Sequence, residues 1–463
     1  MSGARLIRDL ERQVGRHQVL TRAADLAAYS FDAFGASGER HVPDAVVFPA
    51  STDEVSGAVQ VCAHHRVPVV PRGAGTGYAG GAIPLGGGVV VNLCRMSRML
   101  GVEREAMRMK VEAGVVTARA HHAAAAAGLY YPPDPGSSTT STIGGNVACN
   151  AGGPHALRYG VTADHVAGAT AVLADGRIVR LGEGGDGGTD LLRLLVGSEG
   201  TLGVVTEVIL RVIPAPAARS TIAAAFADMD AAARAVAGIA AAKLVPAALE
   251  FLDEAALDAV RRSGVTAYAP RAGALLLVEV EGDASTAAAE SDAVRAAIDS
   301  AGPIAVETAG DAAAAHRLWA ARKAISAAVA RVMIGKVNED VVVPRDRCAE
   351  LVAAVRRIGE ERQVPVVNFG HLGDGNIHAT FLIDPRRPGD RARADAAAGS
   401  LFEVVLGMGG SLTGEHGIGY TKLAFVERQL GDGSIALMRR LKVALDPQGI
   451  LNPGKKIPPV KPA

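Results

Sequence analysis

The glycine-rich stretch "PRGAGTGYAGGAIPLGGG", which begins at Pro71, constrains the fold more than any other part of this sequence. Its segment Gly75–Gly80 matches the G-x-G-x-x-G pattern that opens many dinucleotide-binding folds. The preceding residues agree with such a fold, because they predict a β-α-β unit: a short buried strand over 45–49, a helix and a strand ending at Pro71. Ser51 is the expected helix N-cap, with Glu54 completing a capping box. The question is whether the loop belongs to a nicotinamide-binding Rossmann fold.

The residues that follow the loop argue against a Rossmann fold. There the loop must open a helix whose N-terminus receives the pyrophosphate. Here Pro84 and the triplet Gly86–Gly88 fall within eight residues of Gly80, a composition that excludes a helix. The chain enters a predicted strand over 89–93 instead, and no Asp or Glu stands at its end to bind a ribose hydroxyl. We therefore interpret the loop as a strand-loop-strand nest whose backbone N–H groups converge on an anion.

Two further glycine-rich elements accompany the first. In "YYPPDPGSSTTSTIGGNVACNAGGPHALRYG", three prolines exclude a helix over 130–135, and six consecutive hydroxyl residues, 137–142, precede two glycine pairs. We predict an irregular segment there, of a length that is uncommon unless functional. The third element, "GSEGTLGVVTEV", leads into a strand over 204–213. Three such elements together indicate one long, polar, phosphate-bearing ligand.

Bulk properties narrow the class of protein. A chain of 463 residues is expected to form two or three domains. Lys plus Arg and Asp plus Glu both number 48, so no net charge favours nucleic acid or acidic lipid. The four cysteines are widely spaced, the N-terminus is charged, and no apolar run approaches a membrane span. We expect a cytoplasmic protein that binds no nucleic acid and has no membrane span.

The second half begins at a composition shift. "IPAPAARST" at 213–221 carries two prolines and precedes alanine-rich amphipathic segments, so we place a domain boundary there. Strands are predicted over 274–280 and 340–344, between helices, which indicates a layered α+β domain.

Three groups of polar residues in this half require an explanation. Predicted strands over 364–368 and 377–383, with the turn "GDGN" between them, form a hairpin that can bring His371 and His378 together. Two imidazoles make half of a metal site, and Glu415 in "GGSLTGEHGIGYTK" could complete it, with His416 beside it. Arg322 lies one helical turn beyond the only tryptophan. Taken singly, histidines beside a turn and an arginine on an alanine-rich helix are more often solvated than functional.

The three glycine-rich elements resemble the FAD-contacting elements of the vanillyl-alcohol-oxidase, or p-cresol-methylhydroxylase (PCMH), type of flavoprotein. From about Pro43 to Pro458, the chain is similar to the glycolate oxidase catalytic subunit, the D-lactate dehydrogenases and the D-2-hydroxyglutarate dehydrogenases. The resemblance implies an α+β protein with a two-subdomain, PCMH-type FAD-binding domain over 1–215. A substrate or cap domain over 216–405 and a C-terminal segment over 406–463 that returns to the flavin would follow.

The resemblance also implies the cofactor contacts. The expected FAD-binding residues are Pro71, Arg72, Gly73, Ala74, Gly75, Thr76, Gly77, Gly80, Gly81, Pro135, Thr142, Gly144, Gly145, Asn146, Asn150, Gly152, Gly153, Gly203, Val204, Val205 and Asn452. Some superfamily members attach the flavin through a histidine in the first loop. Thr76 occupies that position here, so non-covalent FAD is expected.

By the same resemblance, His371, His378 and Glu415 hold a divalent metal, for which zinc, manganese and iron all suit the ligands. His416 would be the base, Arg322 would bind the substrate carboxylate, and Lys336 would also face the substrate. The expected reaction is oxidation of a D-2-hydroxy acid, with hydride passing from C2 to flavin N5. The expected electron acceptor is oxygen, an electron-transfer protein or a quinone-linked chain, and a homodimer is left open. A same-fold reductase using a nicotinamide donor, a non-catalytic flavin or metal carrier and a Rossmann dehydrogenase remain as alternatives.

Overall fold

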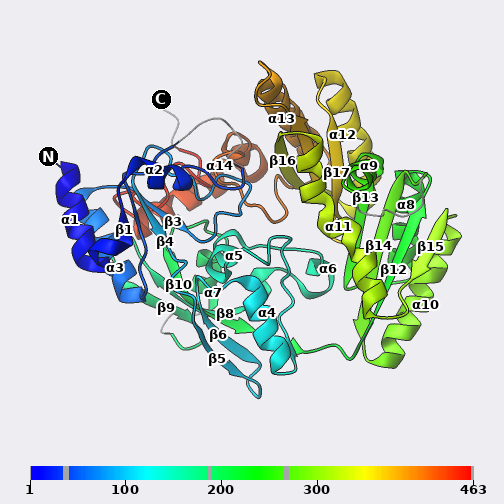
Figure 1. Cartoon of the computed structure of the whole chain (residues 1–463), viewed down its shortest axis with the longest axis horizontal. Helices are drawn as coiled ribbons and strands as arrows, with labels where there is room; N and C mark the ends of the chain where they lie inside the picture. Colours follow the sequence, from blue (N-terminus) through cyan, green and yellow to red (C-terminus); the bar gives the residue numbers. More distant parts are fainter. Residues whose placement is uncertain (1, 35–40, 186–188, 265–270, 460–463) are drawn as a thin grey trace. The chain divides into compact units, whose positions relative to one another are not determined.

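The computed structural model describes residues 2–34, 41–185, 189–264 and 271–459 (Figure 1). The chain forms two compact units. Unit 1 comprises Met1–Gly152, Val161–Ala215 and Glu415–Ala463, and unit 2 comprises Gly153–Gly160 and Pro216–Gly414. Among the helices of these described ranges, none is both long and apolar enough to cross a membrane.

Unit 1 contains a four-stranded sheet in the order β1-β2-β4-β3, in which β2, β4 and β3 run parallel. Its strands are β1 (Val19–Leu20), β2 (Ala45–Val47), β3 (Val69–Arg72) and β4 (Val89–Asn92). Helix α3 (Thr52–His65) connects β2 to β3 and begins as predicted, with the Ser51 hydroxyl accepting the Glu54 N–H at 3.2 Å. The β-α-β unit and the strand after the glycine loop are thus confirmed.

A second sheet in unit 1 is antiparallel, in the order β5-β6-β10-β8-β9. Its strands are β5 (Met99–Glu103), β6 (Arg108–Glu112), β8 (Val166–Val172), β9 (Ile178–Gly182) and β10 (Val204–Arg211). One core cluster joins both sheets, because it contains Val47 and Val91 of the first and Val111 and Val208 of the second. The two sheets and the helices between them therefore fold as one body.

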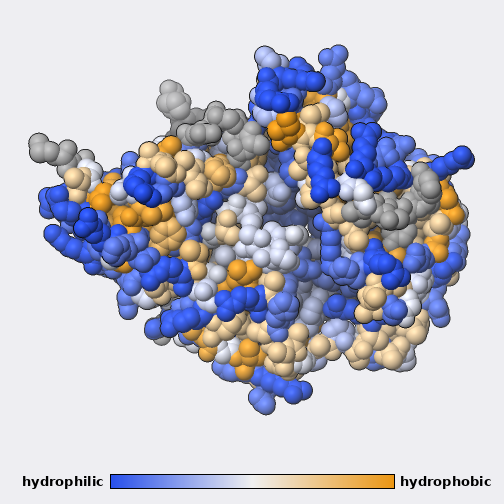
Figure 2. All heavy atoms as spheres, in the orientation of Figure 1, coloured by the Kyte–Doolittle hydropathy of each residue, from blue (hydrophilic) through white to orange (hydrophobic). Residues whose placement is uncertain are grey.

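Shorter elements complete unit 1. They are α1 (Ser2–Val14), α2 (Ala23–Leu26), α4 (Thr117–Ala126), β7 (Leu129–Tyr130), α7 (Thr189–Leu195), β11 (Ile213–Pro214), α14 (Leu423–Leu445) and the 3-10 turns Arg16–Gln18, Ala27–Tyr29 and Thr162–His165. Figure 2 shows mainly hydrophilic residues at the α1 end of the molecule, while Leu6, Leu10 and Val14 of that helix are buried. The chain after α14 returns to β3, where Leu451 forms a bridge with Val69.

The prediction of a long irregular segment in the stretch that begins at Tyr130 is partly wrong, because helix α5 (Ile143–Cys149) lies within it. The Thr142 hydroxyl caps this helix by accepting the Gly145 N–H at 3.3 Å, and Asn150 ends it in the left-handed conformation. A Cβ on Gly144 would lie 2.6 Å from the Ala113 Cβ. The glycines that suggested a loop therefore allow a helix to pack closely against the second sheet.

Unit 2 is built on a seven-stranded antiparallel sheet in the order β15-β12-β14-β13-β17-β18-β16. Its strands are β12 (Ala218–Phe226), β13 (Ala248–Asp253), β14 (Ala274–Gly282), β15 (Ala305–Thr308), β16 (Gly335–Val342), β17 (Val366–His371) and β18 (Asn376–Ile383). Its helices are α6 (Ala156–Tyr159), α8 (Met229–Ala241), α9 (Glu254–Arg262), α10 (Ala284–Ser300), α11 (Ala312–Val332), the 3-10 turn Arg345–Arg347, α12 (Cys348–Arg362) and α13 (Asp390–Gly407). Helices α9 and α11 pack on one face through a core that includes Leu257, Ile325 and Phe369.

The predicted hairpin is confirmed, with shifted bounds. Strand β17 ends at His371, three residues beyond the predicted end at Asn368. Strand β18 starts at Asn376, which pairs with His371. The strand predicted over 340–344 instead begins at Gly335, so Lys336 lies within β16 rather than before it. The sequence pattern missed this because polar or charged residues occupy positions 336 and 338–340 of β16, although most residues of the strand are buried.

Candidate active site

The first glycine loop of unit 1 exposes backbone where a ligand could lie. Gly75 and Gly80 have φ of +71° and +73°, a conformation that favours glycine. A Cβ on Gly80 would lie 2.2 Å from the Tyr420 ring, whereas a Cβ on Gly77 or Gly81 would meet nothing within 4 Å. Some glycines are thus required by packing, while others border open space that would accept a cofactor.

Side chains brace this loop from behind. The buried Arg72 guanidinium donates to the Phe31 carbonyl at 2.8 Å, and burial lowers its pKa. A Cβ on Gly73 would lie 2.2 Å from the Thr142 hydroxyl, so the first loop abuts the start of α5. Two of the predicted cofactor-contacting elements therefore touch each other within unit 1.

Several predicted cofactor residues have side chains engaged in holding the fold. Asn146 donates to the Thr117 hydroxyl at 2.8 Å, and Asn150 accepts the Ala163 N–H at 2.8 Å. Asn452 donates to the carbonyls of Gly81 and Glu199. Asn452 thus links the first loop to the third glycine element. The remaining predicted cofactor residues lie at the end of β3 (Pro71), in the first loop (Ala74, Thr76), before α5 (Pro135), after α5 (Gly152, Gly153) and at the start of β10 (Gly203, Val204, Val205).

The predicted base, His416, lies against the first glycine loop. Its ring centroid is 5.0 Å from that of Tyr78, and the two planes are inclined by 32°. Buried Glu199 accepts the N–H groups of Ile418 at 2.9 Å and Gly419 at 2.6 Å, which fixes the segment after His416. His416 is therefore positioned by both the first and the third glycine elements.

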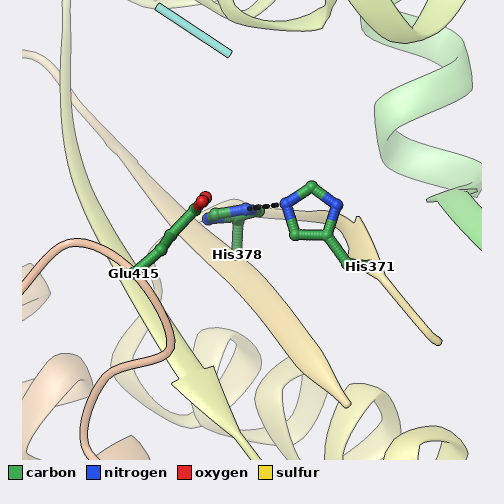
Figure 3. A group of neighbouring side chains, drawn as sticks. All are labelled: His371, His378 and Glu415. Atoms are coloured by element: carbon green, nitrogen blue, oxygen red, sulfur yellow. Dashed lines mark hydrogen bonds between the residues drawn. The ribbon is translucent and has the colours of Figure 1, made fainter. Parts of the chain in front are cut away.

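The predicted metal ligands are brought together. One ligand atom each of His371, His378 and Glu415 lie within 4.8 Å of one another, and Figure 3 shows the three side chains converging. Glu415 directly follows Gly414, the last residue of unit 2, whose N–H donates to buried Asp340 at 2.7 Å. The Asp340 carboxylate also accepts the Thr413 hydroxyl, so it holds the segment that carries Glu415.

The separation of the two imidazoles fits a shared metal ion. Their Nε2 atoms are 3.5 Å apart, as the dashed line in Figure 3 marks. Two nitrogens bound to one tetrahedral zinc at about 2.0–2.1 Å would be about 3.4 Å apart. Both histidines are 4% exposed, and two histidines with one carboxylate leave a coordination position open to substrate.

Behind His371 stands Glu250, which the sequence analysis did not select. One carboxylate oxygen, Oε1, pairs with His371 Nδ1, and the other, Oε2, accepts Arg322 Nε–H at 2.6 Å. Burial alone would raise the pKa of Glu250. The neighbouring His371 and Arg322 together outweigh burial, so the pKa lies below its usual value. The predicted substrate-binding arginine and a predicted metal ligand thus share one buried carboxylate.

The other predicted catalytic residue, Lys336, lies on β16 opposite Leu382 of β18. The register places it on the same face of the sheet as Asp340 and His378, four residues along its own strand from Asp340. Arg322 projects from α11, and its guanidinium also lies 5.2 Å from the Phe369 ring. Lys336, His371 and His378 therefore belong to the sheet face that α9 and α11 cover, and Arg322 reaches this face from α11.

Glu250, Asp340 and Tyr78 carry signals that were present but weak. Glu250 stands in "AALEFLD", where a charge interrupts a run of apolar residues, and Asp340 ends the polar run 338–340 within a strand that is mostly buried. Buried charges are rare unless paired, so such interruptions mark candidates once a strand is known to be covered on both faces. Tyr78 is the one aromatic residue of the first glycine loop.

Comparison with known proteins agrees with this arrangement. Residues 43–182 match the family described as "FAD binding domain", and residues 215–456 match "FAD linked oxidases, C-terminal domain". The chain is 40% identical to the glycolate oxidase subunit GlcD of Bacillus subtilis, covering 92% of this chain and 91% of that protein. It is 35% identical to the D-lactate dehydrogenase of Anaerostipes hadrus, covering 89% of each.

Solved structures show the same fold at low identity. p-Cresol methylhydroxylase with bound substrate gives a TM-score of 0.81 at 18% identity and covers 100% of this chain and 98% of its own. The 4-ethylphenol oxidase of Gulosibacter chungangensis gives 0.81 at 20% identity, covering 99% and 98%. The expected α+β, PCMH-type architecture and the FAD cofactor are thereby confirmed, and the chain belongs to the FAD-linked oxidases, among relatives named glycolate oxidase subunit GlcD and D-lactate dehydrogenase.

Proposed function

We propose that this protein oxidises a D-2-hydroxy acid to the 2-oxo acid with non-covalently bound FAD and a divalent metal ion. The candidate substrates are glycolate, D-lactate and D-2-hydroxyglutarate. The observation that carries the proposal is the 3.5 Å approach of His371 Nε2 to His378 Nε2, with Glu415 completing the group, in a chain of this family. Relatives named for glycolate and D-lactate support the substrate class.

FAD, when bound, supplies the two-electron acceptor for the hydride on C2. Thr76 stands in the loop where covalently flavinylated relatives would carry histidine, and threonine forms no such bond. Gly77 and Gly81 leave open space beside the backbone, which is where the cofactor would lie.

The metal, held by His371, His378 and Glu415, would lower the pKa of a coordinated substrate hydroxyl. Zinc, manganese and iron all fit two histidines and a carboxylate. His416 takes the hydroxyl proton, since its Nε2 lies 3.9 Å from Glu415 Oε1, beside the ligand group. Arg322 binds the substrate carboxylate, and Lys336 provides a second positive charge to it.

The electrons then leave for oxygen, an electron-transfer flavoprotein or a quinone-linked acceptor. Two measurements test the acceptor and assembly as a homodimer. Turnover in air against turnover with an artificial quinone separates oxygen from the other acceptors, and the mass in solution gives the oligomeric state.

The substrate experiment is anaerobic mixing of the flavin-loaded protein with a panel of 2-hydroxy acids in both configurations. Bleaching of the flavin absorbance by one of the three D-configured or achiral acids, and not by L-lactate, is expected. Bleaching by a nicotinamide nucleotide alone would favour the reductase alternative, and a flavin that no donor reduces would favour a carrier.

The metal experiment uses His378→Ala. Metal content by mass spectrometry and the rate of flavin reduction are expected to fall together, because one of three ligands is lost. A metal-free preparation with full activity would remove the metal from the mechanism.

A further inference from the structure

Glu250 is a completely buried carboxylate that contacts two groups with different proposed roles. It lies on β13, directly opposite His371 of β17 in the antiparallel pair. Its exposed fraction is 0%, and its two oxygens are divided between His371 Nδ1 and Arg322 Nε. No substrate or metal atom needs to touch it.

We propose that Glu250 is a positioning residue that sets His371 for metal binding and Arg322 for substrate binding at the same time. This inference rests on the proposed function, which it deepens by linking the two halves of the site. Loss of the carboxylate would weaken metal and acid binding together, although Glu250 contacts neither.

At His371, the contact decides which ring nitrogen faces the metal. A carboxylate accepts a hydrogen bond from Nδ1–H, so the protonated nitrogen faces Glu250 and the Nε2 lone pair faces the ion. That Nε2 is the atom 3.5 Å from His378 Nε2. The Glu250 contact and the metal group therefore use opposite sides of one imidazole.

At Arg322, the contact occupies Nε and leaves the terminal nitrogens. Within the described part of the chain, neither terminal nitrogen makes a hydrogen bond, while the Phe369 ring lies 5.2 Å from the guanidinium carbon. A guanidinium fixed through Nε and packed on a ring presents its remaining N–H groups in one orientation, which suits a carboxylate.

Glutamine cannot replace Glu250 in this role. Its amide offers one acceptor oxygen and one NH₂ donor, and the donor would face either His371 Nδ1–H or Arg322 Nε–H. The Glu250→Gln side chain has nearly the same volume, so the change creates no cavity. Whichever way the amide turns, one contact is lost and the other is weakened, because the remaining acceptor oxygen carries no negative charge.

The test compares wild type with Glu250→Gln in the flavin-loaded protein. Zn²⁺ affinity, measured by competition with a chromophoric chelator, is expected to fall about 10- to 100-fold. At saturating Zn²⁺, the D-lactate concentration that half-saturates flavin reduction is expected to rise about tenfold or more, because a charged hydrogen bond to Arg322 is lost. The visible spectrum of the Co²⁺-substituted variant should also differ from that of wild type.

Asp253→Asn is the matched control. Asp253 is a fully buried carboxylate three residues along the same strand, and it caps α9 by accepting the Ala256 N–H at 2.8 Å. Asparagine also caps helices well, so Zn²⁺ affinity should be unchanged. A further variant, Arg322→Lys, should raise the D-lactate concentration that half-saturates flavin reduction, while its Zn²⁺ affinity stays within about twofold of that of wild type.

The outcomes separate this inference from the proposed function. Suppose that the wild-type protein binds both Zn²⁺ and Co²⁺. If Glu250→Gln then shows the same Zn²⁺ affinity and the same Co²⁺ spectrum as wild type, only the positioning role of Glu250 is overturned. Wild type that binds neither ion overturns the metal assignment and this inference with it. A variant with weakened Zn²⁺ binding and an unaltered half-saturating concentration of D-lactate overturns the shared role.

Discussion

The two units build their candidate binding sites from different chemical groups: backbone in unit 1 and ionisable side chains in unit 2. In unit 1 the glycine loops expose backbone, and the polar side chains around them, such as Asn146 and Asn452, are engaged in bracing the loops. In unit 2 a rigid seven-stranded sheet displays buried ionisable side chains, among them Glu250 and His371, which are held by one another. The first arrangement suits a large cofactor held by shape and backbone N–H groups, and the second suits chemistry that depends on a few charges.

The comparison predicts different sensitivities. In the loops of unit 1, an added methyl group should weaken cofactor binding even where it meets no protein atom, because it occupies space that the cofactor would fill. In unit 2, exchanging one functional group at constant volume, as in Glu250→Gln, should be enough to weaken metal and substrate binding. His416 joins the two designs, since its imidazole is a chemical group carried on a loop of unit 1.

The largest expected effect is that of His416→Ala. General-base catalysis contributes roughly 10²–10⁴-fold, so anaerobic flavin reduction should slow by that factor while FAD stays bound. Stopped-flow absorbance gives the rate, and the absorbance ratio gives the FAD occupancy. The exposed His64→Ala on α3 serves as the control. Rapid bleaching in His416→Ala would refute the assigned base.

The buried Lys455 tests whether the stability of unit 1 depends on the protonation of a side chain. Burial lowers the pKa of Lys455 to about 7, although Asp32 and Glu199 raise it. Between the folded and unfolded pKa values, the unfolded chain holds the extra proton, so stability rises with pH and is lost as pH falls towards 7.

The free energy of unfolding of wild type relative to Lys455→Met should therefore increase by about 1.4 kcal/mol per pH unit from pH 7 to 10. Urea titrations followed by flavin release at several pH values measure this. The exposed Lys110→Met should show no such slope relative to wild type. A flat difference for Lys455→Met would mean that the buried amine is charged throughout.

Gly77→Ala tests the loop design itself. Its Cβ would meet nothing within 4 Å, so the thermal midpoint of the flavin-free protein should not change. The dissociation constant for FAD should rise about tenfold if the cofactor fills that space, since about 1.4 kcal/mol of close contact is lost. Gly101→Ala, also without neighbours within 4 Å but on β5, is the control for both measurements. Unchanged FAD affinity would place the cofactor elsewhere.

The smallest effect is expected at Tyr78. An aromatic pair contributes about 0.5–1.5 kcal/mol, so Tyr78→Leu should slow flavin reduction about two- to tenfold by loosening His416. Tyr78→Phe keeps the ring and should retain the wild-type rate. Equal slowing in both variants would assign the effect to the hydroxyl rather than to ring packing.

Periodicity and turn composition predicted much of the fold. The capping box at Ser51, the strand after the glycine loop and the hairpin that carries His371 and His378 all depend on neighbours within a few residues, and the structure confirms them. Helix α5 was missed because its glycines are favourable only beside Ala113, which is distant in the sequence. The full extent of β16 was missed because its charged residues are buried by tertiary partners.

For the site, the residue types and the local turns that make a glycine nest and a histidine pair possible can be read directly from the amino-acid sequence. The tertiary structure alone decided that Glu250 stands opposite His371, that Asp340 holds the segment before Glu415, and that His416 packs on Tyr78. Such contacts join residues far apart in the chain, and strand register and long-range packing set them. Local propensity carries no information about which distant strand will become a neighbour.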